Sequence, residues 1–381
     1  MKVCLVSLYA LPALSIQHKD GYLGGAEVQL AQLAITLNRL GHEVSLMVLD
    51  SGQPDGAIFE GVKTLKTFKT SAGLPMIRFV YPRWTSLWAA ARRADADVYY
   101  YSCSGMLLGL LAMFCKLHGK RLVYRMASDA DCDLNTVLID SRRDKWLYAY
   151  GLRRADAVLV QSASQQAALA KNFGISSSVI RGLVETPRSD RAATKKDIDV
   201  LWLANLRQLK RPDRLLEIAR ALPEFSFHMA GGEVEGGAAY YAQVEAMARE
   251  VPNLTFHGKI PYMDVGLLFD RARLFANTSE VEGFPNTFLQ AWIRGIPVAT
   301  MFDPDAMVAR EGLGASCSTV PEMISAVRTL LTSPAEHARY SDTALRFMAR
   351  DFGDSKVVGG YLDALSGEPF VLKQQRPQSA A

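Results

Sequence analysis

The residues from 279 to 298 combine an acid, glycines, prolines and an apolar run in an order that can build a binding site. Glu282 is followed by a glycine, a phenylalanine and a proline turn, and Asn286 and Thr287 suit the first turn of an apolar helix. The short apolar run before the motif, 274–276, is typical of a buried strand. The first backbone N–H groups of a helix have no partner within the helix, so they attract an anion such as a diphosphate. The segment therefore predicts an anion site with a carboxylate beside it.

This segment resembles the donor-site signature of the retaining GT-B glycosyltransferases of family 4, also called glycosyl transferases group 1. In that family two glutamates lie eight positions apart: the first approaches the donor sugar, and the second holds the ribose of the nucleotide. The first glutamate matches Glu282, and the second position is Gln290. The resemblance implies that the residues between them also contact the donor: Gly283, Phe284, Asn286 and Thr287.

Gln290 departs from the family pattern. An amide still hydrogen-bonds two hydroxyl groups, but it carries no charge and also offers donors. Because hydrogen bonds to a charged group are stronger, we expect ribose binding to persist with less than its usual strength. The alternative interpretation of the whole segment is an ordinary strand, turn and helix with an acid at the helix start.

A loop with three cationic residues is the second candidate for a functional site. It holds Arg207, Lys210 and Arg211 directly before a helix that begins at Pro212. A diphosphate between two domains needs fixed positive charge, which guanidinium and ammonium groups supply in complementary ways. The resemblance implies that Arg207 and Lys210 neutralise the diphosphate. Their spacing is shorter than the family's usual one, which leaves Arg211 as an alternative for one role, and a solvated basic loop is the plain alternative.

The pair Gly24 and Gly25, followed by Glu27, resembles the glycine-rich loop of the same family. Small residues there let the backbone approach the donor phosphates or the acceptor at a helix N-terminus. A plain turn with a helix cap is the alternative. A dinucleotide site would need glycines spaced G-x-G-x-x-G directly after the first strand and an acid at the end of the second. Asp50 falls at that second-strand end, but the glycine pattern is missing.

The catalytic centre of the first half is less well defined. Many relatives carry a histidine just after the strand that corresponds to 121–125, and it contacts the donor sugar. This chain has none there, so Ser128 and Asp129 are the candidates for that place. His18 and Glu27 are further candidates for a sugar or acceptor contact.

The three aspartates between 129 and 133 also resemble the metal-binding D-x-D of the other main glycosyltransferase fold. They fall in the wrong half of the chain for that role, and the GT-B fold normally needs no metal. We therefore expect no metal and no cofactor, with the nucleotide sugar as co-substrate.

The loop after His257 resembles the family's loop that lines the nucleobase. Gly258 and Ile260 lie in it and are predicted donor contacts. We expect the backbone of this loop to matter more than the imidazole of His257.

Strands alternate with helices twice over, which is the pattern of two doubly wound α/β units. The resemblance implies a GT-B fold, in which two facing Rossmann-like domains enclose a central cleft. We predict an acceptor-side domain over 1–185, a linker over 186–197 and a donor domain over 198–350, with the nucleotide at the carboxyl ends of the strands. A helical segment over 351–370 is a candidate to pack back on the first domain, and 371–381 is expected to be a disordered tail.

Composition limits the class of protein. A chain of 381 residues with 49% hydrophobic content is too long for one ordinary core and suggests two domains. Its 5 cysteines are scattered without paired spacing, which argues against a disulfide framework or a zinc site. The longest apolar run, 106–115, is shorter than the roughly 20 residues of a spanning helix. Because the N-terminus enters an apolar strand directly, without a cleavage-like segment, we expect a cytoplasmic protein.

Charge is unevenly distributed. Residues 1–185 contain 21 Lys and Arg against 15 Asp and Glu, a net charge of +6, which leaves −2 for the rest of a chain whose total is +4. A basic acceptor half suits an anionic acceptor or an anionic membrane surface. The segment 78–88 mixes cations and aromatic residues as interfacial elements do, although its tryptophans are helically spaced and also fit a core face. The expected partners are a nucleotide-sugar donor and a saccharide or lipid-linked acceptor, with peripheral attachment to the cytoplasmic face of a membrane as a further candidate and no nucleic acid.

Together with these patterns, the resemblance implies a retaining glycosyltransferase of hexosyltransferase type. It would move a sugar from a UDP- or GDP-sugar to an acceptor hydroxyl in bacterial polysaccharide, lipopolysaccharide or glycolipid synthesis. The predicted catalytic residues are Glu282, which would orient the sugar, and Arg207 and Lys210, which would stabilise the departing diphosphate. Two alternatives stay open: a nucleotide-sugar epimerase on the same architecture, and a non-catalytic relative that serves as a partner in a polysaccharide assembly complex. The sequence leaves the sugar, the base, the acceptor and the linkage open.

Overall fold

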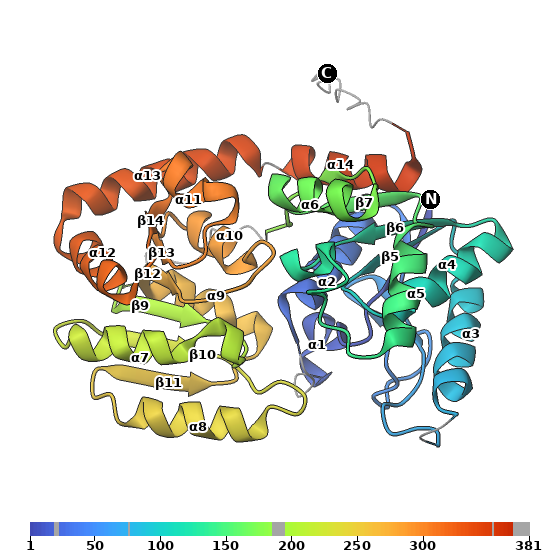
Figure 1. Cartoon of the computed structure of the whole chain (residues 1–381), viewed down its shortest axis with the longest axis horizontal. Coiled ribbons are helices and arrows are strands. Elements are labelled where there is room, and N and C mark those ends of the chain that lie inside the picture. Colours follow the sequence, from blue (N-terminus) through green and yellow to red (C-terminus); the bar gives the residue numbers. More distant parts are fainter. Residues whose placement is uncertain (19–22, 75–76, 185–194, 353, 369–381) are drawn as a thin grey trace, which may run out of the picture.

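Two parallel β-sheets, each covered by helices on both faces, build the protein (Figure 1). The structure is a computed structural model that describes residues 1–18, 23–74, 77–184, 195–352 and 354–368. Strands buried on both faces must be apolar throughout, and all residues of the central strand β5 (Val98–Ser102) are indeed buried. The predicted pair of doubly wound α/β units is confirmed.

The N-terminal sheet has the strand order β3-β4-β2-β1-β5-β6-β7-β8. Neighbouring strands are parallel except β3 and β4, which form an antiparallel pair. The strand order reverses between β1 and β5, and such a switch point opens a crevice at the carboxyl ends of the strands. The strands other than β5 are β1 (Lys2–Val6), β2 (Glu43–Val48), β3 (Ile58–Phe59), β4 (Val62–Lys66), β6 (Arg121–Arg125), β7 (Ala157–Val160) and β8 (Ser178–Val179).

Helix α2 covers one face of this sheet, and α3, α4 and α5 cover the other. The predicted buried helix around 106–115 is α4, and its buried residues confirm that prediction. The helices are α1 (Leu11–Leu14), α2 (Gly25–Arg39), α3 (Thr85–Ala94), α4 (Met106–His118), α5 (Arg142–Leu152) and α6 (Ala163–Phe173), with the short turns η1 (Ile16–His18), η2 (Phe79–Trp84) and η3 (Asp129–Cys132).

The C-terminal sheet has the order β11-β10-β9-β12-β13-β14, and all of its strands are parallel. Its strands are β9 (Ile198–Leu203), β10 (Phe227–Ala230), β11 (Leu254–Gly258), β12 (Ala272–Asn277), β13 (Val298–Thr300) and β14 (Gly314–Ser316). Its helices are α7 (Pro212–Ala221), α8 (Ala238–Arg249), α9 (Tyr262–Arg271), α10 (Asn286–Trp292), α11 (Met307–Glu311), α12 (Val320–Thr332) and α13 (Pro334–Asp351), with the turns η4 (Gln208–Lys210) and η5 (Pro304–Ala306).

The chain returns to the N-terminal domain after α13. Helix α14 (Asp354–Ser366) packs on β5, β6 and β7, where the ring of Tyr361 lies 6.2 Å from that of Tyr100. The Tyr361 hydroxyl also donates to the carbonyl of Arg181 at 3.3 Å. The guanidinium of Arg181 in turn lies 5.5 Å from the ring centroid of Phe352, so the two crossings between the domains touch each other. Residues 185–194, which include most of the predicted linker, and the predicted tail over 371–381 lie outside the described residues.

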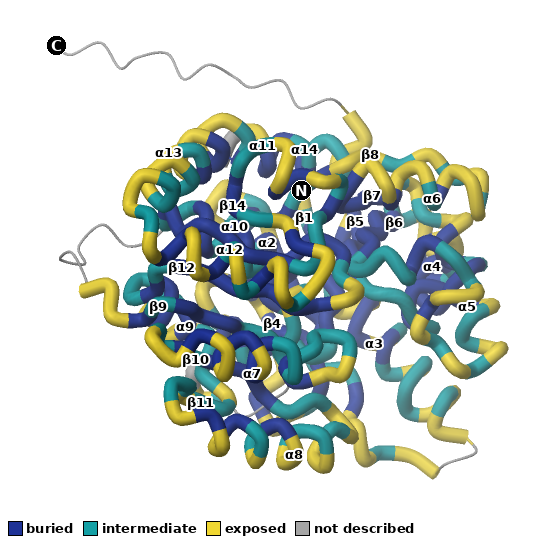
Figure 2. Tube along the Cα trace, turned by 60° about the vertical axis from the view of Figure 1, so that its left-hand side comes forward, coloured by how far each residue is buried: buried dark blue, intermediate teal, exposed yellow. Residues whose placement is uncertain are grey.

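Burial follows this layering. Figure 2 shows the sheet strands largely in dark blue and the outer turns of α8 and α13 in yellow. One cluster of buried apolar side chains continues from the first domain into the second and includes Leu14 of α1 and Phe269 of α9. Within the described residues, every helix is too short or too polar to cross a membrane.

Helices α4 and α5 pack with their backbones in contact at two glycines. A Cβ atom on Gly109 would lie 2.4 Å from the carbonyl oxygen of Leu147, and one on Gly151 would lie 2.6 Å from the carbonyl carbon of Leu108. We predict that Gly151→Ala lowers the free energy of unfolding by about 1–3 kcal/mol, because the added methyl group forces the helices apart. In a free helix the same change is favourable by up to about 1 kcal/mol, so the sign of the change distinguishes the two situations. Urea unfolding followed by circular dichroism measures it, and a gain in stability would contradict the close contact.

Candidate active site

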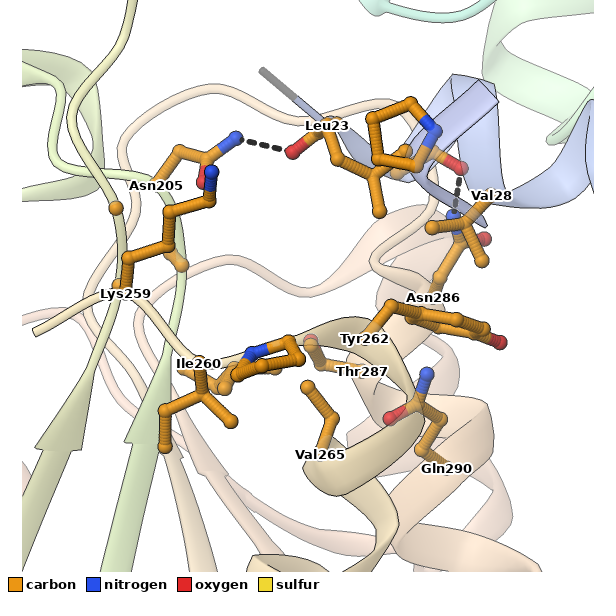
Figure 3. A pocket seen from close by; sticks show the side chains of 18 of the residues that line it. Leu23, Val28, Asn205, Lys259, Ile260, Tyr262, Val265, Asn286, Thr287 and Gln290 are labelled. Atoms are coloured by element: carbon orange, nitrogen blue, oxygen red, sulfur yellow. Dashed lines mark hydrogen bonds between the residues drawn. The ribbon is translucent and has the colours of Figure 1, made fainter. Parts of the chain in front are cut away.

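A pocket of about 180 Å³ lies between the two domains (Figure 3). The C-terminal domain contributes segments that directly follow β9, β10 and β11, and the N-terminal domain contributes the turn before α2. Sites that enclose a whole small molecule measure roughly 300–1,000 Å³, so a nucleotide-sized ligand in this pocket would extend beyond it along the cleft. The predicted donor-binding residues that line the pocket are Gly24, Gly25, Ile260, Asn286, Thr287 and Gln290.

The turn before α2 is held by two asparagines of the other domain. The amide of Asn205 donates to the carbonyl of Leu23 at 2.8 Å, and that of Asn286 donates to the carbonyl of Gly25 at 2.9 Å. Glu27 caps the helix through a 3.1 Å hydrogen bond from the N–H of Gly24 to its carboxylate. The predicted sugar contact Glu27 therefore has a structural role. Asn205 was not predicted. It lies just before the predicted basic loop, and an amide side chain at that position was the available signal.

The structure brings two of the three predicted catalytic residues together. The Nζ atom of Lys210 lies 2.5 Å from Oε1 of Glu282, and the hydroxyl of Ser279 donates to the same oxygen at 2.7 Å. The two charged side chains are only 18% and 14% exposed, and ion pairs shielded from water are stronger than exposed ones. The hydroxyl of Thr278 donates to the carbonyl of Lys210 at 2.8 Å and joins the two loops. Ser279, three residues before Glu282, was not among the predicted site residues, and the structure shows that it contacts a predicted catalytic one.

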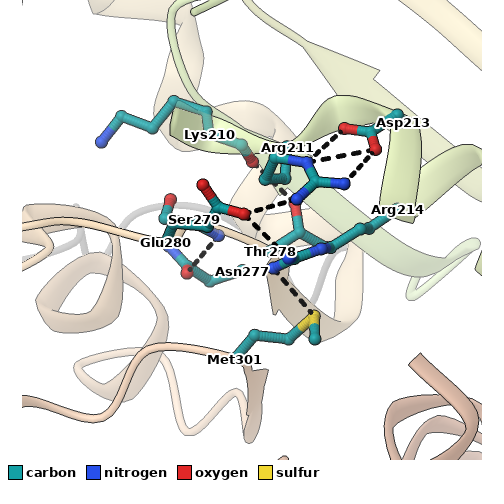
Figure 4. A network of polar contacts seen from close by, with 9 residues as sticks. All are labelled: Lys210, Arg211, Asp213, Arg214, Asn277, Thr278, Ser279, Glu280 and Met301. Carbon is teal, nitrogen blue, oxygen red and sulfur yellow. Dashed lines mark hydrogen bonds and ion pairs between the residues drawn. The ribbon is translucent and has the colours of Figure 1, made fainter. Parts of the chain in front are cut away.

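The other two cations of the basic loop lie elsewhere. Figure 4 shows the guanidinium of Arg211 between the carboxylates of Asp213 and Glu280, with the Lys210 side chain pointing away from this network. Arg214 also pairs with Glu280, at 2.9 Å. Arg211 is thus neutralised by neighbouring acids and is a poor alternative for the diphosphate. Arg207 is exposed at the start of η4, outside the pocket lining and the Glu282 contact.

The loop that carries Glu282 packs directly on the N-terminal domain. A Cβ atom on Gly283 would lie 2.4 Å from the carbonyl oxygen of Ala127, so only glycine fits this approach. The N–H of Asp129 donates to the carbonyl of Glu282 at 3.3 Å. The structure therefore places the loop after β6, where the family histidine is missing, beside the predicted catalytic glutamate.

Asp129 lies within this contact as a partly buried carboxylate. Its Oδ1 accepts a 2.8 Å hydrogen bond from Gln165 of α6. Burial raises the pKa of Asp129, the hydrogen bond from Gln165 opposes that effect, and the nearby carboxylates of Asp305 and Glu282 raise the pKa further. The predicted candidate Ser128 instead caps η3, where its hydroxyl accepts from the N–H of Ala130 at 3.3 Å.

Three further predicted contacts also lie outside the pocket lining. His18 shares a 3.1 Å hydrogen bond with the Ser15 hydroxyl. Phe284 is buried, with its ring 6.3 Å from that of Trp292, so its side chain serves the core. Gly258 has a φ of +63° at the end of β11, which lets the chain turn into the lining segment that contains Ile260.

Asp305 also connects the two domains, through the first turn of α6. Its carboxylate accepts hydrogen bonds from the N–H groups of Ala163 and Ser164 at 2.7 and 3.0 Å, at the start of α6. Asp305 and Ala306 both have a φ of +53°, a conformation that costs non-glycine residues about 1–3 kcal/mol each. The contact with α6 offsets part of this strain. No sequence signal marks Asp305, because the partner helix is more than a hundred residues away.

Within the described residues, no group of three or more His, Cys, Asp or Glu side chains is arranged to hold a metal ion. The imidazoles of His228 and His257 share a 2.9 Å hydrogen bond with each other. The expectation that catalysis needs no metal stays a prediction.

Comparison with known families supplies the decisive observation. Residues 23–188 match the family described as Glycosyltransferase Family 4, and residues 185–344 match Glycosyl transferases group 1. The chain belongs to this type of glycosyltransferase. No curated protein sequence matches it. The two matches meet near residue 185, between the two sheets, so each domain of the glycosyltransferase carries one of them.

Solved glycosyltransferases share the fold. Sucrose-phosphate synthase from Thermosynechococcus elongatus has a TM-score of 0.75 at 16% identity, over 96% of this chain and 98% of that one. HepE from Anabaena, in complex with UDP and glucose, has a TM-score of 0.74 at 15% identity, over 96% and 100%. WaaG, a glycosyltransferase involved in lipopolysaccharide biosynthesis, has a TM-score of 0.67 at 15% identity, again over 96% and 100%. The predicted GT-B fold is confirmed.

The hydrogen bonds between Asp305 and α6 give a testable link between the domains. We predict that Asp305→Asn accelerates hydrogen exchange at the N–H groups of Ala163 and Ser164 by at least about tenfold, because a hydrogen bond to a charged group contributes about 1.5–3 kcal/mol. Burial raises the pKa of Asp305, but hydrogen bonds from Ser164 and Ala163 outweigh it and leave the pKa below its usual value. The contribution is therefore full at neutral pH and is lost as the pH falls through this lowered pKa, below the usual range of an aspartate.

Asp303 is the matched control for this measurement. Its carboxylate accepts from the N–H groups of Val308 and Ala309 at 2.7 and 3.1 Å, so it caps α11 within its own domain. Asp303→Asn should raise exchange at Val308 and Ala309 and leave α6 unchanged. Equal exchange at Ala163 in the wild type and in Asp305→Asn would disprove the link between the domains.

Proposed function

We propose that the protein is a retaining hexosyltransferase that moves a sugar from a nucleoside-diphosphate sugar to a hydroxyl of a saccharide or lipid-linked acceptor. The observation that carries this proposal is the shielded pair of Lys210 and Glu282, whose loop packs against the N-terminal domain, in a protein whose two domains also enclose a pocket. A carboxylate that can bind sugar hydroxyls and a cation that can bind phosphate lie together there, as transfer from such a donor requires.

Different segments of the pocket lining suit different parts of a nucleotide sugar. We infer that the nucleoside lies between the segment after β10 and the segment from Lys259 to Met263, with the ribose at Gln290. The diphosphate would then lie at the N-terminus of α2, a helix of 15 residues, within reach of Lys210. Gln290 in the pocket lining and the N-terminus of α2 at the same pocket support this placement.

The reaction follows from this placement. The acceptor oxygen bonds to the anomeric carbon while the bond between that carbon and the diphosphate oxygen breaks, on the same face of the sugar, so the configuration is retained. The proton of the acceptor hydroxyl passes to the departing diphosphate. Lys210 and the α2 amides stabilise the negative charge that grows on the diphosphate. Glu282, oriented by Ser279, would hold the donor sugar, and the closed cleft would keep water from competing.

The solved relatives suggest where to begin. HepE was solved with UDP and glucose, and WaaG is involved in lipopolysaccharide biosynthesis. We therefore propose a UDP-hexose as the first donor to examine, and bacterial polysaccharide, lipopolysaccharide or glycolipid synthesis as the pathway class. GDP-hexoses are the second donor class.

Replacing Glu282 tests the proposal. We predict that Glu282→Ala lowers sugar transfer by at least about tenfold, which corresponds to roughly 1.4 kcal/mol in the barrier, because the donor sugar loses its orienting contact. Transfer of radiolabelled sugar from UDP- and GDP-hexoses to membrane and saccharide extracts measures it. Undiminished transfer by this variant would contradict the role assigned to Glu282.

A binding measurement separates the remaining alternatives. A nucleotide at a hundred times its dissociation constant should stabilise the native protein by about 2.7 kcal/mol, which a thermal shift detects. Stabilisation by UDP together with transfer supports the proposal. Interconversion of the free nucleotide sugar without acceptor would identify an epimerase instead, and the absence of any shift with UDP- and GDP-sugars would favour the non-catalytic relative.

At Gln290 we predict a substitution that strengthens ligand binding instead of weakening function. We predict that Gln290→Glu tightens nucleotide-sugar binding by roughly three- to tenfold, because a charged acceptor forms stronger hydrogen bonds with the ribose hydroxyls than an amide does. Isothermal titration with UDP or GDP measures it, with Gln290→Ala as the variant that should bind more weakly than the wild type. Weaker binding by the glutamate variant would show that the amide donors of Gln290 are needed and that the ribose is held in another way.

A further inference from the structure

Exposed aromatic and apolar side chains gather along α5 and η2, in the N-terminal domain at the right of Figure 1. Trp146 is 59% exposed, Tyr81 is 66% exposed, and Leu138, just before α5, is 71% exposed. Single exposed apolar residues are ordinary, but a group of large ones on adjoining elements marks a contact surface. We name this surface the aromatic–arginine face; it consists of Val80, Tyr81, Leu138, Arg142, Arg143, Trp146, Tyr150 and Arg154.

Arginines alternate with rings across this face. The guanidinium of Arg143 lies 3.8 Å from the ring centroid of Phe79 and joins α5 to η2. One turn further along α5, the rings of Trp146 and Tyr150 are stacked at 5.6 Å, and Arg154 lies 5.6 Å from the Tyr150 ring. Stacking and cation–π contacts keep these side chains ordered at the surface rather than folded into the core.

The predicted interfacial segment 78–88 divides into two parts. Trp84 and Trp88 pack against the core, and the indole N–H of Trp88 donates to the carbonyl of Leu110 at 3.0 Å. Their helical spacing indeed reflected a core face. Val80 and Tyr81 remain exposed and adjoin α5, which the sequence reasoning did not include. The exposed surface is therefore built from two segments more than fifty residues apart.

The charge of this region has one predominant sign. Residues 69–94 contain 5 Lys and Arg and no Asp or Glu. Residues 138–154 add Arg142, Arg143, Lys145, Arg153 and Arg154 against the two acids Asp140 and Asp144. A second copy of the chain would present the same cations to this face in a twofold contact, and like charges would repel. A surface of continuous negative charge complements the face instead.

We propose that the aromatic–arginine face docks the protein on an anionic lipid bilayer. Trp146, Tyr81 and Leu138 would lie at the level of the headgroups, and the arginines would contact lipid phosphates. This inference rests on the proposed function in one respect: docking would bring the acceptor-side domain to a lipid-linked acceptor. Docking itself requires no catalysis and can be tested without it.

Trp146 makes docking directly measurable. Of the 5 tryptophans, Trp202 and Trp292 are buried and Trp84 and Trp88 pack against the core, so Trp146 is the one that meets solvent most. We expect the emission of the full-length protein to shift to shorter wavelength with vesicles of phosphatidylglycerol and phosphatidylcholine, and not with phosphatidylcholine alone. The shift should weaken as salt is added and should vanish in Trp146→Phe. An equal shift in Trp146→Phe would overturn the placement of the bilayer.

Charge reversal tests the arginines. Each arginine near an anionic bilayer contributes about fivefold to binding, so Arg142→Glu with Arg154→Glu should weaken co-sedimentation with the anionic vesicles by at least about 25-fold. The matched control is Arg220→Glu with Arg249→Glu, which removes two exposed arginines from α7 and α8 of the other domain. The control should bind as the wild type does. Equal loss in both double variants would overturn the assigned face.

Two further measurements distinguish docking on a bilayer from a damaged nucleotide site and from a contact between protein chains. The thermal shift with UDP or GDP should be the same in the wild type and in the Arg142 and Arg154 variant, because these residues lie outside the pocket lining. Failure of nucleotide binding in every form would count against the proposed function and leave vesicle binding to be judged alone. If light scattering instead showed that this double variant turns an oligomer into a monomer and neither form bound vesicles, the face would be a protein interface and the docking proposal would be wrong.

Discussion

The loop that carries Glu282 meets the N-terminal domain backbone to backbone, and the geometry of the cleft depends on that approach. A side chain at position 283 would collide with the carbonyl of Ala127, and the hydrogen bond from Asp129 to the carbonyl of Glu282 forms only when the loops are this close. Asn205, Asn286 and Asp305 add contacts on either side. A contact between two backbones has little freedom to adjust, because it cannot be relieved by the rotation of a side chain and the surrounding atoms are close-packed. The position of the carboxylate relative to both domains is therefore set with little tolerance.

Within this frame, charge is sorted into two separate networks. Arg211 and Arg214 are matched by Asp213 and Glu280 and serve the fold, whereas Lys210 is directed to Glu282 and the cleft. Under the proposed function, this shielded ion pair would exchange partners when the donor enters, because the lysine would bind phosphate and the glutamate would bind sugar hydroxyls. On that proposal, the same pair would serve both the empty and the occupied site.

The two faces of the N-terminal domain serve different purposes. The carboxyl edge of its sheet, with the turn before α2 and the loop after β6, belongs to the cleft. The outer face, with α5 and η2, carries rings and arginines that the core does not use. This division follows from a parallel sheet, since its connecting helices cover both faces and leave only the strand ends free to build a site.

The sequence by itself determined the two α/β units, the buried helix at 106–115 and the motif that contains Glu282, because strand and helix periodicity, caps and a contiguous signature are local properties. It also marked Lys210, Asn286 and Gln290, which lie within or next to that signature or in the basic loop. Only the tertiary structure decided that Arg211 pairs with acids and that Arg207 faces solvent, because neighbouring side chains on a loop point in different directions. It alone revealed Asn205, Asp305 and the face formed by η2 and α5. These contacts join residues from about fifty to almost two hundred positions apart, and their proximity is set by packing of the two sheets, which no local pattern encodes.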